Sequence, residues 1–128
     1  MNLLLLFTLL GFTPVAHADE IRAITVEYST STAPLVLNAL AYKYGIDAEE
    51  FIKTAYCESH YNANAVGDHG NSYGVWQINL PSHPNISKEQ ALDPWWSTEW
   101  AAQQFAANKQ RMWTCWRKLQ NEKNIPTA

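Results

Sequence analysis

The sequence is poor in cysteine and in basic residues, and each shortage excludes a class of protein. Two cysteines are too few for a disulfide-rich miniprotein and too few for a zinc site built from thiolates. Nine Lys and Arg against twelve Asp and Glu give a net charge of −3, so the chain lacks the basic footprint of a nucleic-acid-binding protein. The apolar run Leu3–Leu10 is too short to span a bilayer, and no cysteine follows it to carry a lipid, so we expect no stable membrane anchor.

The composition is that of one folded domain. A chain of 128 residues is expected to form a single domain, and a hydrophobic content of 47% excludes a disordered chain. Residues 1–18 end in Ala16-His17-Ala18 after the apolar run, which is the pattern of a secretory signal peptide; a buried N-terminal helix is the alternative. We therefore expect an exported chain, periplasmic or secreted, with a domain over 19–128 and a flexible or strand-like lead-in over 19–33.

Export changes the expectation for the two cysteines. Outside the cytoplasm, Cys57 and Cys115 are expected to form a disulfide, with two buried free thiols as the alternative. The chain-entropy estimate gives such a bridge roughly 4 kcal/mol of stability.

Helical patterns dominate from Pro34 onward, so the expected fold class is mainly α (α+β). Two apolar sets recur at spacings of three and four before Gly45, a candidate C-cap: Leu35, Ala39 and Tyr42, and Leu37, Leu40 and Tyr44. Asp47 is a good N-cap for a second helix over 47–60. The apolar face of that helix comprises Ala48, Phe51, Ile52, Ala55, Tyr56 and Ser59.

The rest of the chain is less regular. Residues 61–87 are loop-like, with a possible strand over 74–78 after a turn at Gly70-Asn71. Ser87 and Gln90 form a capping box for a short helix, which Asp93-Pro94 breaks. A last helical region begins near Ser97 and forms either one helix or two with a joint near Gln110.

Glu58 is the candidate catalytic residue. It lies near the edge of the apolar face of the 47–60 helix, at the C-terminal end, where the helix dipole disfavours a carboxylate. Both features disfavour the charged form, so a raised pKa is the hypothesis.

The motifs around Glu58 resemble those of a known family. Glu58-Ser59 is followed by Asn62 with Ala65, and Gly74-Val75-Trp76-Gln77 ends nineteen residues after Glu58. With flanking elements, this resembles the soluble lytic transglycosylase (SLT) domain of the lysozyme-like superfamily over roughly residues 38–116. The resemblance implies a lysozyme-like domain with a central catalytic helix and a small β-hairpin region.

The resemblance also implies a reaction. Glu58 would be the single general acid and base that cleaves the β-1,4 bond between N-acetylmuramic acid and N-acetylglucosamine, leaving 1,6-anhydro ends. Neither a cofactor nor a metal is implied. The expected substrate contacts are Ser59, Asn62, Ser72, Tyr73, Gly74, Trp76, Gln77, Asn79 and Trp96, with Trp76 and Trp96 as the aromatic residues exposed in the cleft.

Two positions depart from the relatives. Animal-type lysozymes place their second carboxylate where this chain has Ser72, and the loop's one acid, Asp68, is either a hydrolytic partner or a turn residue. The SLT domain usually carries an Ala-Tyr-Asn element in a late helix, whose Tyr contacts the catalytic Glu. This chain has no such element, which leaves Trp113, Trp116 or Tyr73 as replacements.

The alternatives are a muramidase that adds water, a hydrolase of chitin-like glycans, and a non-catalytic glycan-binding or envelope-assembly module. The remaining tryptophans are expected mainly in the core or at its rim, and the histidines show no metal-ligand spacing. The expected partners are peptidoglycan strands and, by analogy, a secretion or conjugation apparatus, with the chain itself a monomer.

Overall fold

The structure is a computed structural model, and it describes residues 26–124. The expected signal peptide and residues 19–25 of the lead-in lie outside this range. The described part contains five α-helices and a three-stranded antiparallel sheet in the order β1-β2-β3. The elements are α3 (Ala33–Tyr44), α4 (Ala48–Ser59), β1 (Val66–Gly67), β2 (Ser72–Tyr73), β3 (Ile78–Asn79), α5 (Lys88–Leu92), α6 (Pro94–Ala106) and α7 (Thr114–Lys123), with 3-10 turns at Asp68–Gly70, Leu80–Ser82 and Gln110–Met112.

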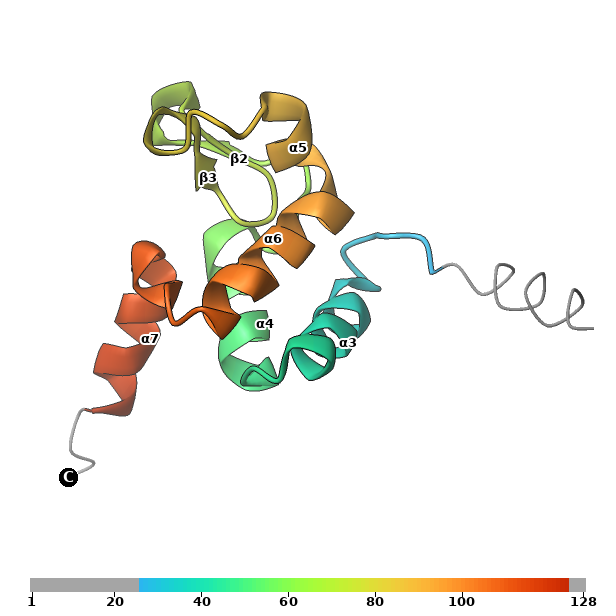
Figure 1. Ribbon diagram of the computed structural model, residues 1–128, viewed down its shortest axis with the longest axis vertical. Coiled ribbons are helices and arrows are strands. Elements are labelled where there is room, and N and C mark those ends of the chain that lie inside the picture. Colours follow the sequence, from blue (N-terminus) through green and yellow to red (C-terminus); the bar gives the residue numbers. More distant parts are fainter. Residues whose placement is uncertain (1–25, 125–128) are drawn as a thin grey trace, which may run out of the picture.

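The elements enclose one core, which lies around the middle of α4. Figure 1 shows α6 crossing the middle of the domain, with the sheet and α5 at one end, α3 and α4 at the other, and α7 beside α4. Phe51 of α4 stacks on Trp76 with ring centroids 4.6 Å apart, and Phe105 of α6 meets both rings edge-on. This cluster fixes α4, and therefore its C-terminal turn, relative to the sheet.

Local signals set the ends of the helices as predicted. Gly45 ends α3 in the left-handed conformation, with φ of 64°. The side chain of Asp47 accepts a hydrogen bond from the Glu50 amide and caps α4, and Ser87 forms the capping box with Gln90 at the start of α5. The predicted helix over 47–60 is therefore confirmed, and the mainly helical fold class with it.

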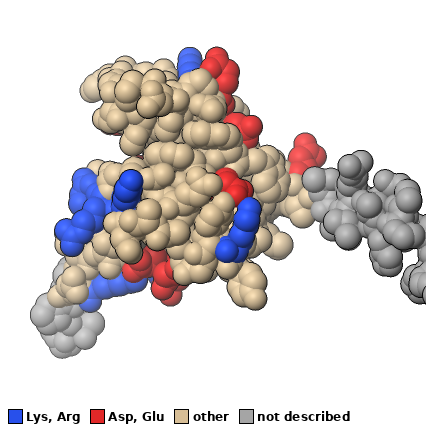
Figure 2. Space-filling view, in the orientation of Figure 1, with Lys and Arg blue, Asp and Glu red and all other residues tan. Residues whose placement is uncertain are grey.

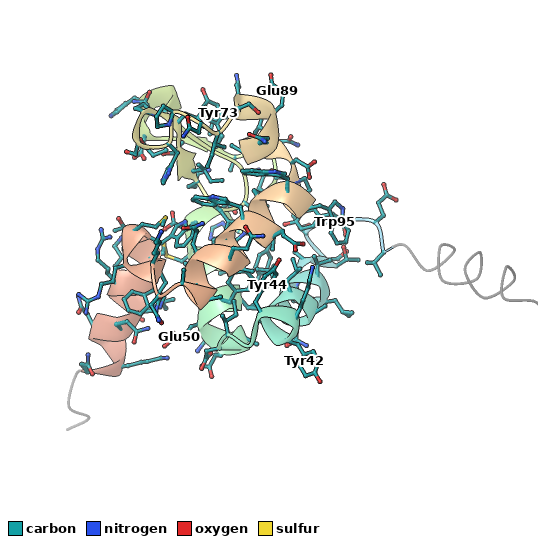
Figure 3. All side chains as sticks on the ribbon, in the orientation of Figure 1. Tyr42, Tyr44, Glu50, Tyr73, Glu89 and Trp95 are labelled. Atoms are coloured by element: carbon teal, nitrogen blue, oxygen red, sulfur yellow. A yellow bond between two sulfur atoms is a disulfide. The ribbon has the colours of Figure 1, made fainter. Side chains whose placement is uncertain are left out.

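The two apolar sets that predicted α3 differ in how they pack. Leu35 is 66% exposed and Tyr42 is 91% exposed and points away from the domain (Figure 3). The buried residues of the helix are Ala33, Val36, Leu37 and Ala41, and Leu40 and Tyr44 of the second set are partly buried against the core. Apolar residues surround this helix on nearly every side, so spacing alone did not determine which side packs.

Two predictions need correction. Residues 74–77 form a turn between β2 and β3 rather than a strand, because Gly74 and Gln77 have positive φ. The last helical region is two helices, and the first begins at Pro94 rather than near Ser97, because the Asp93 side chain accepts from the amides of Trp95 and Trp96 and caps α6. No helix in the described range is both long and apolar enough to cross a membrane.

The Gly74→Ala substitution is expected to destabilise the domain by roughly 2–4 kcal/mol. Gly74 has φ of +79°, and a Cβ there would lie 2.0 Å from the carbonyl oxygen of Ala91. Thermal unfolding measures the loss. Gly70→Ala is the matched control, because Gly70 also has a positive φ but has no atom within 4 Å of its Cβ position. Equal losses in the two variants would mean that close packing against α5 is unimportant.

Candidate active site

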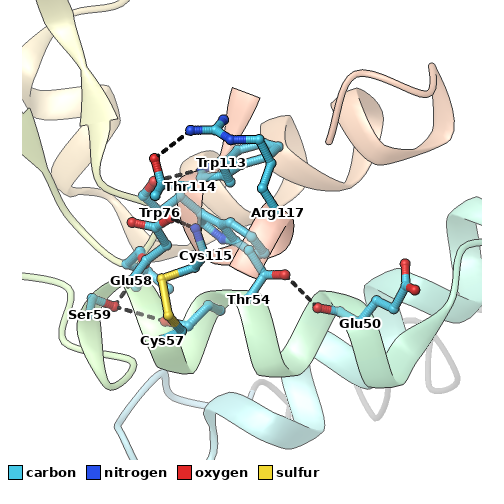
Figure 4. Close-up of a disulfide and its surroundings, with 12 residues drawn as sticks. Glu50, Thr54, Cys57, Glu58, Ser59, Trp76, Trp113, Thr114, Cys115 and Arg117 are labelled. Carbon is cyan, nitrogen blue, oxygen red and sulfur yellow. Dashed lines mark hydrogen bonds between the residues drawn. A yellow bond between two sulfur atoms is a disulfide. The ribbon is translucent and has the colours of Figure 1, made fainter. Parts of the chain in front are cut away.

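Glu58 lies in the last turn of α4, where it faces the start of α7 (Figure 4). The side chain is partly buried, and its Oε1 accepts a hydrogen bond of 3.2 Å from the backbone amide of Cys115. Cys115 is also bonded to Cys57, the neighbour of Glu58, through the predicted disulfide. No other hydrogen bond to the Glu58 carboxyl comes from the described residues.

The surroundings of Glu58 raise its pKa above the ordinary value of 4.5. Burial is the largest cause, because removing water penalises the charged form, and the negative charge of Asp68 adds to it. The Cys115 amide and the positive charges of Lys118 and Arg117 act in the opposite direction. The net direction is the one predicted from the sequence, and it favours a carboxyl group that holds its proton closer to neutral pH.

A polar chain runs through the sheet close to Glu58. Ser72 of β2 is 1% exposed, and its hydroxyl donates to Asp68 Oδ2 at 2.5 Å. The Asn79 side chain lies across the sheet, 3.5 Å from the same hydroxyl. Asp68 itself is exposed and sits in the 3-10 turn with φ of 50°. Ser72 is thus buried beneath the loop. Asp68 forms part of the turn, and its charge raises the pKa of Glu58.

Several motif residues hold the backbone together. The Ser59 hydroxyl donates to the Val75 carbonyl at 2.7 Å and ties α4 to the β2–β3 turn. The side-chain amide of Gln77 donates to the backbone carbonyls of Gly74 and Ala65, across the same loop.

Trp76 is not in the cleft, so that prediction is wrong. Its side chain has 0% exposure, and its indole N–H donates to the Thr98 hydroxyl of α6. Gly74 is likewise buried against α5 and presents no surface to a ligand.

A cavity of about 180 Å³ opens beside the sheet and contains two of the predicted residues, Gln77 and Asn79. Trp100 and Trp113 provide aromatic walls, and His83 adds a polar group. The complete lining is Gln77, Ile78, Asn79, Ser82, His83, Trp100, Met112 and Trp113. This mixture of apolar walls and a few polar groups is typical of a site for a small amphiphilic ligand.

The other predicted contacts lie outside this cavity. Asn62 is exposed, and its side chain accepts from the Asn64 amide within a turn. The Tyr73 hydroxyl donates to the Gly70 carbonyl within the hairpin. Trp96 is partly exposed and stacks on Trp100, with the rings 10° from parallel, so it backs a cavity wall.

Sequence patterns missed one contact and underweighted others. Nothing in the sequence identifies the Cys115 amide as the group that meets Glu58, because every residue except proline has such a donor. His83 and Met112 come from segments with no motif, and among the tryptophans Trp100 and Trp113 line the cavity where Trp96 was preferred. Within the described range, no cluster of three or more His, Cys, Asp or Glu could hold a metal ion.

One of three comparisons with known proteins gives a match. No curated protein and no solved structure matches the chain. A family model described as the transglycosylase SLT domain matches residues 36–120, which include α4, the sheet and most of α7. The chain therefore belongs to the transglycosylase SLT domain family.

Proposed function

We propose that the chain cleaves the β-1,4 bond between N-acetylmuramic acid and N-acetylglucosamine in peptidoglycan, with Glu58 as its single acid and base. The observation that carries this proposal is the state of Glu58, which is partly buried, raised in pKa and held by one backbone amide. Membership of a family whose domains cleave peptidoglycan as lytic transglycosylases supports the choice of substrate.

The proposed reaction needs no water. Neutral Glu58 gives its proton to the glycosidic oxygen as the bond from that oxygen to the muramic C1 breaks. The Glu58 carboxylate then takes the proton of the muramic C6 hydroxyl, whose oxygen bonds to C1. The products are a free 4-hydroxyl on the leaving sugar and a 1,6-anhydro ring. Because the attacking hydroxyl belongs to the same sugar, proximity favours it over water.

The cavity beside the sheet is a suitable site for one N-acetyl sugar. Trp100 and Met112 offer apolar contact to a ring face or an acetyl methyl group, and Asn79 offers an amide for hydrogen bonds. The net charge of −3 gives no bulk attraction to an anionic wall, so recognition would depend on this cleft or on delivery by a partner. On the face in Figure 2 the largest group of basic side chains lies on the side of α7 and the 3-10 turn before it, and smaller groups lie elsewhere on that face.

The disulfide is typical of a protein that folds outside the cytosol, which supports the proposal that the chain acts as an exported enzyme. We propose that it acts as a monomer. We propose the periplasm or the extracellular space as the location, and a secretion or conjugation apparatus as the candidate partner.

Product analysis tests the proposed reaction. Purified peptidoglycan is digested with the chain from residue 19 onward, and the muropeptides are weighed by mass spectrometry. Anhydromuramyl ends are the expected product, and each is lighter than a reducing end by one water. Reducing ends alone would mean that the enzyme is a hydrolase.

The hydrolytic alternative depends on Asp68, whose charge acts on Glu58. With the lytic mechanism, Asp68→Asn is expected to keep anhydro products and to lose activity only severalfold. Because the charge of Asp68 raises the pKa of Glu58, its removal lowers that pKa, and the alkaline fall of activity should move to lower pH. The pH dependence of muropeptide release measures this. A loss of several hundredfold together with reducing products would instead identify Asp68 as a hydrolytic partner.

A further inference from the structure

The start of α7 has backbone amides that the helix's own N-cap residue does not cap. Trp113 occupies the N-cap position of this helix and makes no side-chain cap hydrogen bond. The first amides of any α-helix have no partner within the helix, and Cys115 carries one of them. Glu58 accepts this amide from a different helix, at a distance of 3.2 Å. The carboxyl thus serves as a remote cap for α7, and α7 fixes the orientation of the carboxyl.

The disulfide ties the two halves of this contact together. Cys57 directly precedes Glu58, and Cys115 is the residue that donates the amide, so the bridge joins the neighbour of the acceptor to the donor itself (Figure 4). Cys115 is buried while Cys57 is exposed, which places the bond at the edge of the α4–α7 contact. A bridge in this place limits how far the amide can move from the carboxyl.

Docking of α7 on α4 has a second, separate set of contacts at the other end of the helix pair. The carboxylate of Glu50 accepts hydrogen bonds from Trp116, Gln120 and Lys123, at 3.2, 2.9 and 3.0 Å. These contacts attach Trp116, Gln120 and Lys123 of α7 to the first turn of α4 and do not involve Glu58. Without the bridge, the Glu50 contacts would still attach α7 to α4. The loss of the bridge should therefore act mainly on the distance between the Cys115 amide and Glu58.

The position of the amide determines where the acid proton sits. In a neutral carboxyl the carbonyl oxygen accepts hydrogen bonds better than the hydroxyl oxygen does, so an N–H on Oε1 favours the proton on the other oxygen, Oε2. Oε2 has no hydrogen-bond partner among the described residues, which leaves it free for a substrate oxygen. In a carboxyl that rotated away from the amide, neither oxygen would be favoured as the protonated one, so the acid proton would point in two directions.

We propose that the Cys57–Cys115 disulfide is a positioning device for Glu58, which holds the Cys115 amide on Oε1 and thereby directs the acid proton on Oε2 toward the bond to be cleaved. This inference rests on the proposed function.

The test removes the bridge from the chain that begins at residue 19, with the double substitution Cys57→Ala and Cys115→Ala. We expect kcat on peptidoglycan to fall about tenfold with little change in KM, because orientation is lost while the cavity is not. The amide also favours the carboxylate, so its departure should move the alkaline fall of activity to higher pH. The charged groups that face Glu58, namely Asp68, Lys118 and Arg117, stay unchanged in this variant.

Glu50→Gln is the matched control, because it weakens the same pair of helices at the end remote from Glu58. Its melting temperature should fall, while kcat and the pH profile per folded molecule should stay as in the wild type. Folded fractions come from the near-ultraviolet circular dichroism of the tryptophans. Where the bridge-free variant unfolds, trehalose restores the compact state without contacting Glu58 specifically. Wild type reduced with dithiothreitol should behave as the double variant does.

A bridge-free variant with the kcat and pH profile of the wild type would overturn the proposal, as would one whose changes match those of Glu50→Gln. The carbon-13 chemical shift of the Glu58 carboxyl, followed against pH, gives a reading that needs no catalysis. If the wild type cleaves no glycan, the proposed function fails. An upward move of the Glu58 pKa without the bridge would still support the positioning role, and an unchanged pKa would contradict it.

Discussion

Glu58→Gln is expected to lower peptidoglycan cleavage by about 10³-fold while leaving the domain folded. A glutamine keeps an oxygen that can accept the Cys115 amide, so the end of α4 and the start of α7 should hold their places. Its amide has no proton acidic enough to give to a glycosidic oxygen. Release of soluble muropeptides, measured against the wild type at equal folded concentration, gives the loss.

The same substitution should raise the melting temperature at neutral pH. Folding raises the pKa of Glu58 above 4.5, so the folded state disfavours the ionised carboxyl. The unfavourable contribution of Glu58 to stability is therefore absent below its unfolded-state pKa of 4.5 and develops as the pH rises through that value to the folded-state pKa. A glutamine does not ionise and avoids that contribution. The gain should appear at pH 7 and vanish in acid.

Glu49→Gln is the matched control for this result. Glu49 lies on the same helix but is exposed, and its pKa is lowered by a hydrogen bond from Lys53. Its replacement should leave cleavage unchanged and should not stabilise the domain at neutral pH. Retained activity in Glu58→Gln, or an equal loss in Glu49→Gln, would contradict the assignment of Glu58.

Residues with a local role were predictable from the sequence. Asp47 and Gly45 act on amides and carbonyls within one turn, so their types identify the ends of α4 and α3 without knowledge of the fold. The direction of the Glu58 pKa shift was also predicted, from a helix-end carboxylate beside an apolar face, although its largest cause, burial, comes from tertiary packing. The disulfide was predicted because an exported chain meets oxidising conditions, and the positions of the two cysteines played no part in that argument.

Features that depend on tertiary packing were not predictable in this way. Both sides of α3 are apolar, and contact with α4 and α6 decides that Val36 rather than Leu35 is buried. The turn at residues 74–77 brings Gly74 against the backbone of Ala91, a residue far along the chain, where no side chain would fit. The Cys115 amide reached Glu58 only through the docking of α7. In each case a partner distant in sequence determined the outcome.

Trp76→Ala is expected to destabilise the domain by about 4 kcal/mol, the second large effect. The side chain has 0% exposure and contacts the rings of Phe51, Phe105 and Trp113. Its removal leaves a large cavity among them and deprives the Thr98 hydroxyl of a donor. For a domain of this size, the melting temperature should fall by roughly 15–30 °C. Urea and thermal unfolding measure both quantities.

Trp76→Phe separates this core role from binding of sugar. Phenylalanine keeps most of the ring packing and loses the indole N–H, so the cost should be about 1–2 kcal/mol. Because the ring is buried, KM for glycan should stay unchanged at a temperature where the variant is folded. Trp100→Phe is the matched variant. Trp100 lines the cavity, so its replacement by the smaller phenylalanine should raise KM for glycan. If KM rose in Trp76→Phe and stayed unchanged in Trp100→Phe, Trp76 would be a sugar contact. The cavity beside the sheet would then not be the glycan site.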